Sequence, residues 1–360
     1  MSKTKIENSL IFAIIILSVL ILAVYFSPKV YERYVREKGS SFKEINNYII
    51  ETDDVKEIGL KEPIFYYYDG VKLIGNNLAK TLKWEVILED DNWNFKLVQN
   101  GLFGINKETN KVRFYDLEGD ENWNFKTKYK IDYYNEVDSK FVLLLQKENE
   151  SEIIIVDDKG EAIHREIIEN DENLLNVQID ENKMFFIYYG YDDEPYTKLI
   201  VKDMENNFDL KYKVKLPKQL IMEVFSEDNI YYICTDKELI KIQNGSSLWR
   251  KNIKEEILSI CKGKDKYAYI ERKNNKLSLI LINFSGEIEK EIGINNSFDK
   301  IIYDRGRYYI WDRQSILGYN SDGEKEFDYS ANNYIKNFWL EKENAYIWTG
   351  ERVIKLRFER

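Results

Sequence analysis

Short acidic segments recur along the chain, and one of them is bounded by tyrosines. The segment YYGYDDEPY spans residues 188–196. Two shorter segments, EDDN at residues 89–92 and ENDEN at residues 169–173, are similar in charge. Clustered carboxylates attract cationic groups, and tyrosines are frequent at the centres of binding surfaces. The sequence therefore predicts these candidate binding residues: Tyr191, Asp192, Asp193, Glu194, Tyr196, Asp90, Asp91, Asp171 and Glu172.

A second interpretation of the acidic segments is that they are solvated loops of an acidic protein. Calcium binding is a weaker prediction, because calcium needs several oxygen ligands that converge on one point. No segment has the spacing of an EF-hand loop. We therefore assign no cofactor and no metal ligand, and calcium stays a weak expectation.

Residue types that commonly act as nucleophiles or metal ligands are sparse. The one histidine, His164, occurs in GEAIHREII without a serine nucleophile motif nearby. Cys234 and Cys261 lie in apolar runs and form no CxxC pair, which disfavours a redox motif or a zinc site. Two buried thiols are expected, with a disulfide between neighbouring strands as the alternative. No catalytic residue is assigned.

The composition indicates a strand-rich chain that does not bind nucleic acid. Its 360 residues carry 53 lysines and arginines against 63 aspartates and glutamates, a formal net charge of −10. No basic block is present, whereas a nucleic-acid-binding protein usually carries a basic face. The 27 tyrosines and 18 phenylalanines favour β-strands. A chain of this length can bury a large core.

An apolar segment near the N-terminus predicts a transmembrane anchor. LIFAIIILSVLILAVYF, residues 10–26, contains only Ser18 and Tyr25 as residues with polar groups. As a helix it would cover roughly 25 Å, close to the thickness of the hydrocarbon core. A cleaved signal peptide is the alternative, but the following AVYFSPK offers bulky residues where a peptidase needs small ones. The expected organisation is a short tail at residues 1–9, the anchor at 10–26, a stalk at 27–41 and one domain at 42–360.

The charges on the two sides of the anchor give conflicting signals about its orientation. The basic residues near it are Lys3 and Lys5 on one side and Lys29, Arg33, Arg36, Lys38 and Lys43 on the other. A bare count favours a cytoplasmic domain. Short basic tails before a first apolar segment usually stay inside, however, and the long domain that follows is translocated. We therefore expect a single-pass protein of the cell membrane with an extracytoplasmic domain.

From about residue 42 onward, a hairpin pattern recurs with a period near 40 residues. Each unit has an apolar run, a turn rich in Gly, Asn, Asp or Ser, and a second run, as in EIIIVDDKGEAIHREII from Glu152. The hairpins begin at residues 71, 111, 152, 198, 238, 278, 315 and 352. Two further strand-like runs precede each hairpin. Four strands in such a period predict one blade of a β-propeller.

The hairpins predict an all-β ring of eight four-stranded blades, or of seven if the first weak unit is irregular. The eighth unit ends at Arg360 after its third strand. FKEINNYII, from Phe42, is available as the fourth strand, and this pairing would close the ring without an exposed edge. The near-identical DNWNFK at 91–96 and ENWNFK at 121–126 are not the repeat, because the first enters an inner strand and the second an outer strand.

The unit resembles the repeats of quinoprotein-like (PQQ-like) and WD40-like propellers. NGSSLW at residues 244–249, and the stretch from GVKLIGNN to LKW, are similar to the Gly-x-x-x-Trp ending of quinoprotein-type repeats. With its anchor, the chain looks like a family of membrane-tethered propellers from low-GC Gram-positive bacteria. This resemblance implies a propeller fold and no established activity. The tryptophans are expected to pack between blades.

These patterns favour a membrane-anchored, non-catalytic scaffold that binds a protein or a cell-wall polymer. By analogy with known propellers, the loops that contain the acidic segments are expected to emerge on one face. The alternative is a hydrolase or lyase that acts on glycans through carboxylates of the central channel, with Glu223 and Asp299 as candidates. That chemistry needs two acids about 5–10 Å apart.

Overall fold

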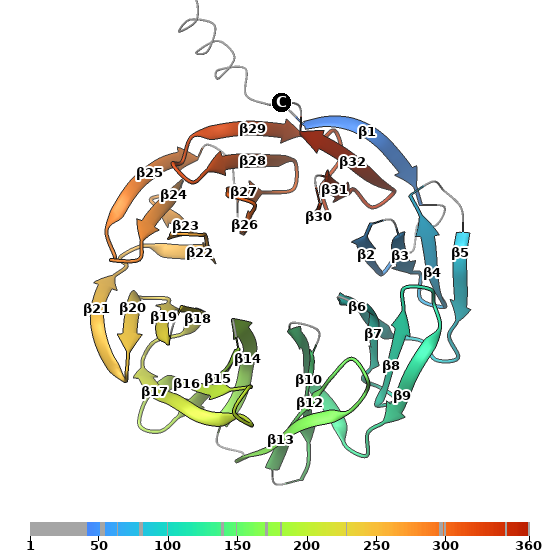
Figure 1. Ribbon diagram of the computed structural model, residues 1–360, viewed down its shortest axis with the longest axis horizontal. Coiled ribbons are helices and arrows are strands. Elements are labelled where there is room, and N and C mark those ends of the chain that lie inside the picture. The colour runs from blue at the N-terminus through green and yellow to red at the C-terminus, as the bar shows by residue number, and fades with distance from the viewer. Residues whose placement is uncertain are drawn as a thin grey trace, which may run out of the picture.

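The propeller expected from the repeat is present. The computed structural model describes residues 42–358 except 51–54, 63, 79–81, 99, 138–139, 149, 170–171, 181, 228, 295–297, 299 and 343. In this part the chain forms eight four-stranded sheets arranged as a ring around a central axis (Figure 1). The predicted all-β architecture with eight blades is therefore confirmed.

The predicted tail, anchor and stalk, at residues 1–9, 10–26 and 27–41, lie outside the described residues. Within the described residues, no helix has the length and apolar character needed to cross a membrane.

The first four blades occupy residues 57–217. Blade 1 contains β2 (Glu57–Lys61), β3 (Ile64–Tyr68), β4 (Lys72–Asn77) and β5 (Leu82–Ile87). Blade 2 contains β6 (Trp93–Val98), β7 (Gly101–Asn106), β8 (Lys111–Asp116) and β9 (Glu121–Lys126). Blade 3 contains β10 (Lys130–Val137), β11 (Lys140–Gln146), β12 (Glu150–Val156) and β13 (Ala162–Glu169). Blade 4 contains β14 (Glu172–Asp180), β15 (Lys183–Tyr191), β16 (Pro195–Asp203) and β17 (Asp209–Pro217).

The last four blades complete the ring. Blade 5 contains β18 (Ile221–Glu227), β19 (Ile230–Thr235), β20 (Glu238–Gln243) and β21 (Ser246–Asn252). Blade 6 contains β22 (Glu256–Lys262), β23 (Lys266–Lys273), β24 (Lys276–Asn283) and β25 (Ile288–Ile294). Blade 7 contains β26 (Lys300–Asp304), β27 (Arg307–Trp311), β28 (Ser315–Asn320) and β29 (Lys325–Ser330). Blade 8 contains β30 (Asn337–Glu341), β31 (Asn344–Trp348), β32 (Arg352–Phe358) and β1 (Phe42–Ile49).

Each blade runs from strand a at the channel to strand d at the outer rim, with neighbouring strands antiparallel (Figure 1). Because the strands alternate in direction, the b–c and d–a connections of all blades emerge on one face, which we call the upper face. The a–b and c–d connections form the lower face. Residues 88–92 and 192–194 are d–a and b–c connections, so these acidic segments share the upper face, as predicted.

The N-terminal strand closes the ring in the predicted way. β1 pairs with β32 from Phe42 opposite Phe358 to Ile49 opposite Arg352. The Ile50 N–H then donates a hydrogen bond of 2.9 Å to the carbonyl of Glu351 on the upper face. The chain therefore enters β1 from the lower face, and the last strand of blade 8 comes from the other end of the domain.

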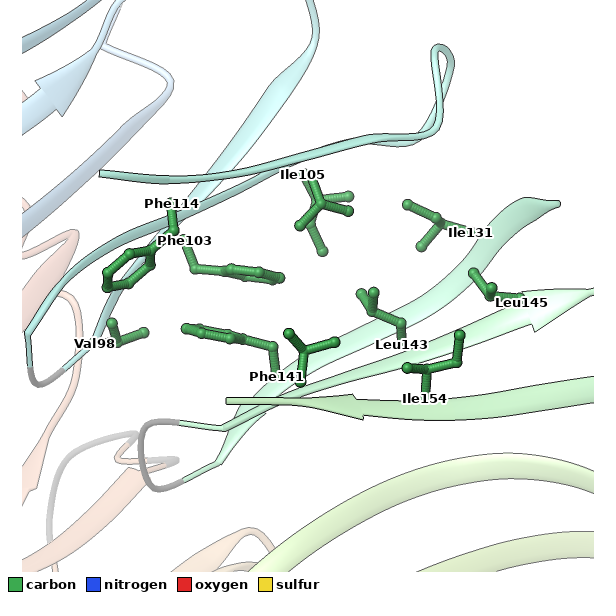
Figure 2. Packing of buried hydrophobic residues seen from close by; sticks show 11 residues of the cluster. Val98, Phe103, Ile105, Phe114, Ile131, Phe141, Leu143, Leu145 and Ile154 are labelled. Carbon is green, nitrogen blue, oxygen red and sulfur yellow. The ribbon is translucent and has the colours of Figure 1, made fainter. Parts of the chain in front are cut away.

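The core lies between blades, where the faces of neighbouring sheets pack together. Between blades 2 and 3 the rings of Phe103 and Phe141 stack at a centroid distance of 3.6 Å, and Ile105, Leu143 and Ile154 surround them (Figure 2). These residues come from middle strands, whose alternation directs one side chain to each neighbouring blade. Full burial of such a side chain contributes about 1.5–3 kcal/mol.

Tryptophans of the outer strands pack on glycines in the c–d turn of the next blade. Trp84 lies against Gly119, and its Nε1–H donates to the Leu117 carbonyl at 2.9 Å. Trp123 lies against Gly160 in the same way. These contacts confirm the expected inter-blade packing at these tryptophans. His164 has the register position of the tryptophan in blade 3 and stacks on Phe208 at 4.2 Å, which gives it a structural role.

Inner strands of consecutive blades are joined by side chains, because their channel-side edges have no strand partner. Gln178 Oε1 accepts a 3.0 Å hydrogen bond from Val224 N, and Asp180 Oδ2 accepts one of 2.6 Å from Ser226 N. Ser259 Oγ accepts from Ile301 N at 3.3 Å. Polar residues in these strands therefore satisfy backbone groups that would otherwise face the channel unpaired.

Candidate functional site

The predicted segment YYGYDDEPY forms the upper end of blade 4, where it joins β15 to β16. Tyr191 is 65% exposed, and its neighbour Tyr189, which was not among the predicted residues, is 38% exposed. Tyr196 is only 4% exposed, because its ring packs under Lys215, whose Nζ lies 3.6 Å from the ring centroid. Tyr189 and Tyr191 therefore face solvent, whereas Tyr188 and Tyr196 are buried beneath the loop.

Lysines pair with the carboxylates of this segment. Lys215 pairs with Asp192, and Lys218 Nζ lies 2.6 Å from Glu194 Oε2. Such exposed pairs contribute about 0–1 kcal/mol each. Asp193 is exposed and has no ion-pair partner among the described residues. The pairing makes this part of the upper face less negative than the sequence alone indicates.

Glu172 approaches the same segment from the start of the inner strand of blade 4. Its carboxylate pairs with Lys198 and accepts a hydrogen bond from the Tyr196 hydroxyl at 3.2 Å. Lys198 is itself 8% exposed. Glu172, Tyr196 and Asp192 thus belong to one network, which Lys198 and Lys215 connect. The predicted Asp171 lies outside the described residues.

Asp90 and Asp91 lie elsewhere on the upper face, between blades 1 and 2. Asp90 Oδ2 accepts a 2.6 Å hydrogen bond from Lys111 Nζ. Asp91 and Lys56 line a hollow of about 600 Å³, and the buried amide of Asn106 donates to the Asp91 carbonyl at 2.6 Å. The structure therefore divides the predicted residues into two groups, one on blade 4 and one between blades 1 and 2.

A smaller pocket, of about 210 Å³, lies on the upper face between blades 3 and 4. Its apolar lining consists of Leu144, Ile168 and Leu174, which are buried, with exposed fractions of 7%, 6% and 7%. Its polar lining includes the predicted Glu172 together with Asp132, Gln146, Lys147, Glu148, Ser151 and Asn173. The blade 3–4 pocket is thus connected through Glu172 to the network on blade 4.

Sequence reasoning missed most residues of the blade 3–4 pocket. The pairing of β10 with β11 shifts register between Ile131 and Tyr133, so the bulged Asp132 is left unpaired and exposed. No local motif marks such a bulge. The available signal was the polar run QKENE at 146–150, which joins strands b and c of blade 3 and could have been grouped with ENDEN at 169–173.

Two acids on inner strands have strongly raised pKa values and lie in opposite blades. Glu223 lies on the inner strand of blade 5, and burial together with the nearby Asp180 raises its pKa to about 7. Burial also raises the pKa of Glu57, on the inner strand of blade 1, to about 7. The hydrogen bond that Glu57 accepts from the Phe95 amide acts in the opposite direction and is outweighed. Blades 1 and 5 face each other across the channel (Figure 1). Asp299, the other predicted channel acid, lies outside the described residues.

A family model matches part of the chain. Residues 202–356 match the model of a family of unknown function, DUF5711, and this matched segment is less than half of the chain. No curated protein matches the sequence.

Solved propellers cover nearly the whole described domain. BamB from Moraxella catarrhalis aligns with a TM-score of 0.58 at 10% identity, over 88% of this chain and 100% of that one. Saccharomyces cerevisiae Sqt1 aligns with a TM-score of 0.60 at 10% identity, over 89% and 100%. The Dos1 propeller aligns with a TM-score of 0.59 at 10% identity, over 89% and 96%. The chain is a β-propeller similar in structure to BamB and to WD40 propellers, and at this identity the likeness concerns the fold alone.

The two cysteines are free thiols. Cys234 is buried between blades 5 and 6, and Cys261 is partly buried on the inner strand of blade 6. Burial raises the pKa of both thiols, which keeps them protonated and unreactive at neutral pH. Of the two thiols expected to be buried, Cys234 is buried and Cys261 is partly buried.

The described residues contain no group of three or more His, Cys, Asp or Glu side chains placed to hold a metal ion. Where they are described, the acidic residues of the upper face mostly contact lysines instead.

Proposed function

We propose that the protein is a membrane-tethered, non-catalytic scaffold that binds a partner through the upper face of its propeller. Residues 10–26 anchor it as a single span, and the propeller lies outside the cytoplasm. The partner is a protein or a cell-wall polymer. β-Propellers typically serve as binding scaffolds, and Glu57 and Glu223, the two channel acids whose pKa is raised to about 7, lie in opposite blades of the ring.

One observation carries the proposal: exposed tyrosines, a charged network and a pocket converge on the upper ends of blades 3 and 4. Tyr189 and Tyr191 supply exposed aromatic surface, and Glu172 connects the blade 4 network to the pocket. Tyrosine combines apolar area with a hydrogen-bonding hydroxyl, which is the combination that binding hot spots use. A structural role alone does not require tyrosines to face solvent at this place.

The topology supports an anchor on the opposite side from this site. β1 begins at Phe42 on the lower face, so the preceding segment joins the ring there. A tether at the lower face leaves the upper face directed away from the membrane. The binding residues would then be presented to partners that the membrane itself does not block.

Site-specific photo-cross-linking in cells tests the binding face. A photoreactive residue replaces Tyr191, which is 65% exposed on the upper face, or Leu210, which is 60% exposed near the lower face as a matched control. The expected result is a discrete adduct from position 191 that is absent from position 210. Neutralising Asp192, Asp193 and Glu194 should weaken that adduct. Equal adducts from both positions, or none from either, would contradict the proposal.

Thiol labelling tests the location of the propeller. Tyr191→Cys should react with a membrane-impermeant maleimide on intact cells, because position 191 is 65% exposed, whereas Cys234 is buried and Cys261 is partly buried on an inner strand. The unmodified chain is the control and should label only after denaturation. Labelling of the variant only after lysis would place the domain in the cytoplasm.

A further inference from the structure

The blade 3–4 pocket has a chemical character that points to one class of ligand, and this inference rests on the binding function proposed above. Its surface is mostly polar, and Leu144, Ile168 and Leu174, which are almost fully buried, add a small aliphatic part. Its volume of about 210 Å³ is below the ~300 Å³ at which pockets for drug-sized molecules begin. The space therefore suits one side chain or one small molecule with an alkyl portion.

The cationic group at the rim of the pocket is already paired. Lys147, the one cation that lines it among the described residues, contacts Glu150 at 2.9 Å and Glu152 at 3.2 Å. The hydrogen bonds that Lys147 donates to these carboxylates raise its pKa, so it stays charged and paired with them. Lys107 Nζ donates to the backbone carbonyl of Asp132 at 2.6 Å and does not neutralise the Asp132 carboxylate.

The acceptors at the rim are free in the described structure. Asp132 and Glu148 have exposed carboxylates, and neither makes an ion pair with a described residue. The side chains of Gln146 and Asn173 likewise have no partner within the described part of the chain, and each adds an amide group that can accept or donate a hydrogen bond. Glu172 is held in place by Lys198 and by the Tyr196 hydroxyl, so its orientation is fixed in advance. A rim with surplus acceptors and no free cation disfavours an anion.

We infer that the blade 3–4 pocket binds an organic cation: an ammonium or guanidinium group carried on an alkyl stem. The stem packs on Leu144, Ile168 and Leu174, and the charged head donates hydrogen bonds to Asp132 and Glu148 at the rim. This is the manner in which lysine and arginine side chains bury their stems and keep their heads in polar surroundings. The same chemistry is available from a lysine or arginine of a partner protein and from a free aliphatic amine.

Saturation-transfer NMR titrations of the full-length chain test this assignment. The probes are the N-acetyl methylamides of lysine, arginine and citrulline, together with free cadaverine. The lysine and arginine probes should bind with dissociation constants on the order of millimolar, as expected for a single side chain. Citrulline has nearly the shape of arginine without its charge and should bind at least tenfold more weakly. Cadaverine that binds more tightly than either amino-acid probe would indicate a free amine as the natural ligand, and the reverse order would indicate a partner side chain.

Variants locate the binding to this pocket. Asp132→Asn with Glu148→Gln should lower the affinity for the charged probes at least tenfold. Asp120→Asn with Glu118→Gln removes the same charge from exposed positions in a turn of the lower face and should leave binding unchanged. The inference is overturned if citrulline binds as well as arginine, if both double variants behave alike, or if no probe binds. The citrulline comparison uses the unaltered chain, so it holds even if a variant folds poorly.

The outcome separates this inference from the proposed function. If the probes fail but the cross-link from position 191 persists, the upper face binds a partner and the pocket does not take a cation. If the cross-link also fails, the scaffold proposal itself is wrong.

Discussion

Glu62 joins the first and last blades through three donors. Its carboxylate accepts hydrogen bonds from Lys355 at 2.7 Å, from the Asn344 amide at 3.0 Å and from the Tyr346 hydroxyl. Burial alone would raise the pKa of Glu62, but the hydrogen bonds from Lys355 and Tyr346 outweigh it and lower the pKa. Glu62→Gln should cost about 1–3 kcal/mol of unfolding free energy at pH 7, because it leaves Lys355 without its counter-charge. Urea denaturation measures this loss.

The same substitution predicts a pH dependence with a definite sign. A lowered pKa in the folded state means that Glu62 stabilises the fold above its unfolded value of about 4.5, and that this stability is lost as pH falls further. The difference between wild type and Glu62→Gln should therefore shrink below about pH 4. Glu118→Gln, at an exposed turn of the lower face, is the control and should differ little from wild type at any pH. A gap that stays constant down to pH 3 would contradict the role given to the carboxylate.

Glu223 should show the opposite behaviour. Burial and Asp180 raise its pKa to about 7, so the folded state favours the protonated acid. Its contribution to stability is present below about pH 4.5 and is lost as pH rises towards 7. Glu223→Gln should therefore match wild type near pH 4.5 and exceed it by about 2 kcal/mol at pH 8. Chemical denaturation at the two pH values gives the comparison, and equal destabilisation at both would show that the carboxylate is needed for packing instead.

Whether an individual side chain of the site is exposed or buried was what the sequence could least predict. Tyr191 and Tyr196 lie in one short segment, yet one is exposed and the other packs under Lys215. Composition does not distinguish them, because exposure here depends on strand alternation and on the position of a lysine in the next strand. The ion pairs have the same origin: Asp192 and Lys215 are 23 residues apart and meet only because β15, β16 and β17 lie side by side.

At the scale of elements, the c–d turns set the contact between neighbouring blades. Gly119 has a φ of +89°, and a Cβ there would lie 2.5 Å from the Trp84 ring. Gly245 has a φ of +77° with no atom within 4 Å of such a Cβ. Gly119→Ala combines backbone strain with a clash and should cost about 2–4 kcal/mol, whereas Gly245→Ala should cost only about 1 kcal/mol. Thermal unfolding of the two variants separates the cost of backbone strain from the cost of the clash with Trp84. Equal losses of stability in the two variants would mean that the tryptophan contact is unimportant.

Elements were predictable where a period repeats and unpredictable where one residue breaks it. The hairpin starts at 111, 152 and 238 fall within two residues of the observed β8, β12 and β20. The bulges at Asp132, and at Met222 in β18, could not be found, because an inserted residue changes no local composition. They still determine which inner-strand side chains face the neighbouring blade, and at Asp132 which reach the pocket.

At the scale of the whole molecule, stability depends on joining the two ends of the domain. Removal of residues 42–50 would leave β32 as an open edge and would take Tyr48 and Ile50 out of the core between blades 8 and 1, where they pack with Phe65 and Val353. Deletion of this segment should therefore abolish cooperative unfolding or cause aggregation, because an unpaired strand invites pairing with another chain.

A circular permutant tests whether closure requires a strand from the N-terminus or only a strand in that position. Phe42 pairs with Phe358, so a short turn after residue 360 could lead directly into a transplanted 42–50 segment as an ordinary c–d hairpin. In a chain that starts at residue 51, this permutant should recover cooperative unfolding with a midpoint near that of the unaltered propeller. A permutant with the segment scrambled is the control and should behave like the deletion. If the correct permutant also fails to fold, the N-terminal strand has a role in folding beyond completing the eighth blade.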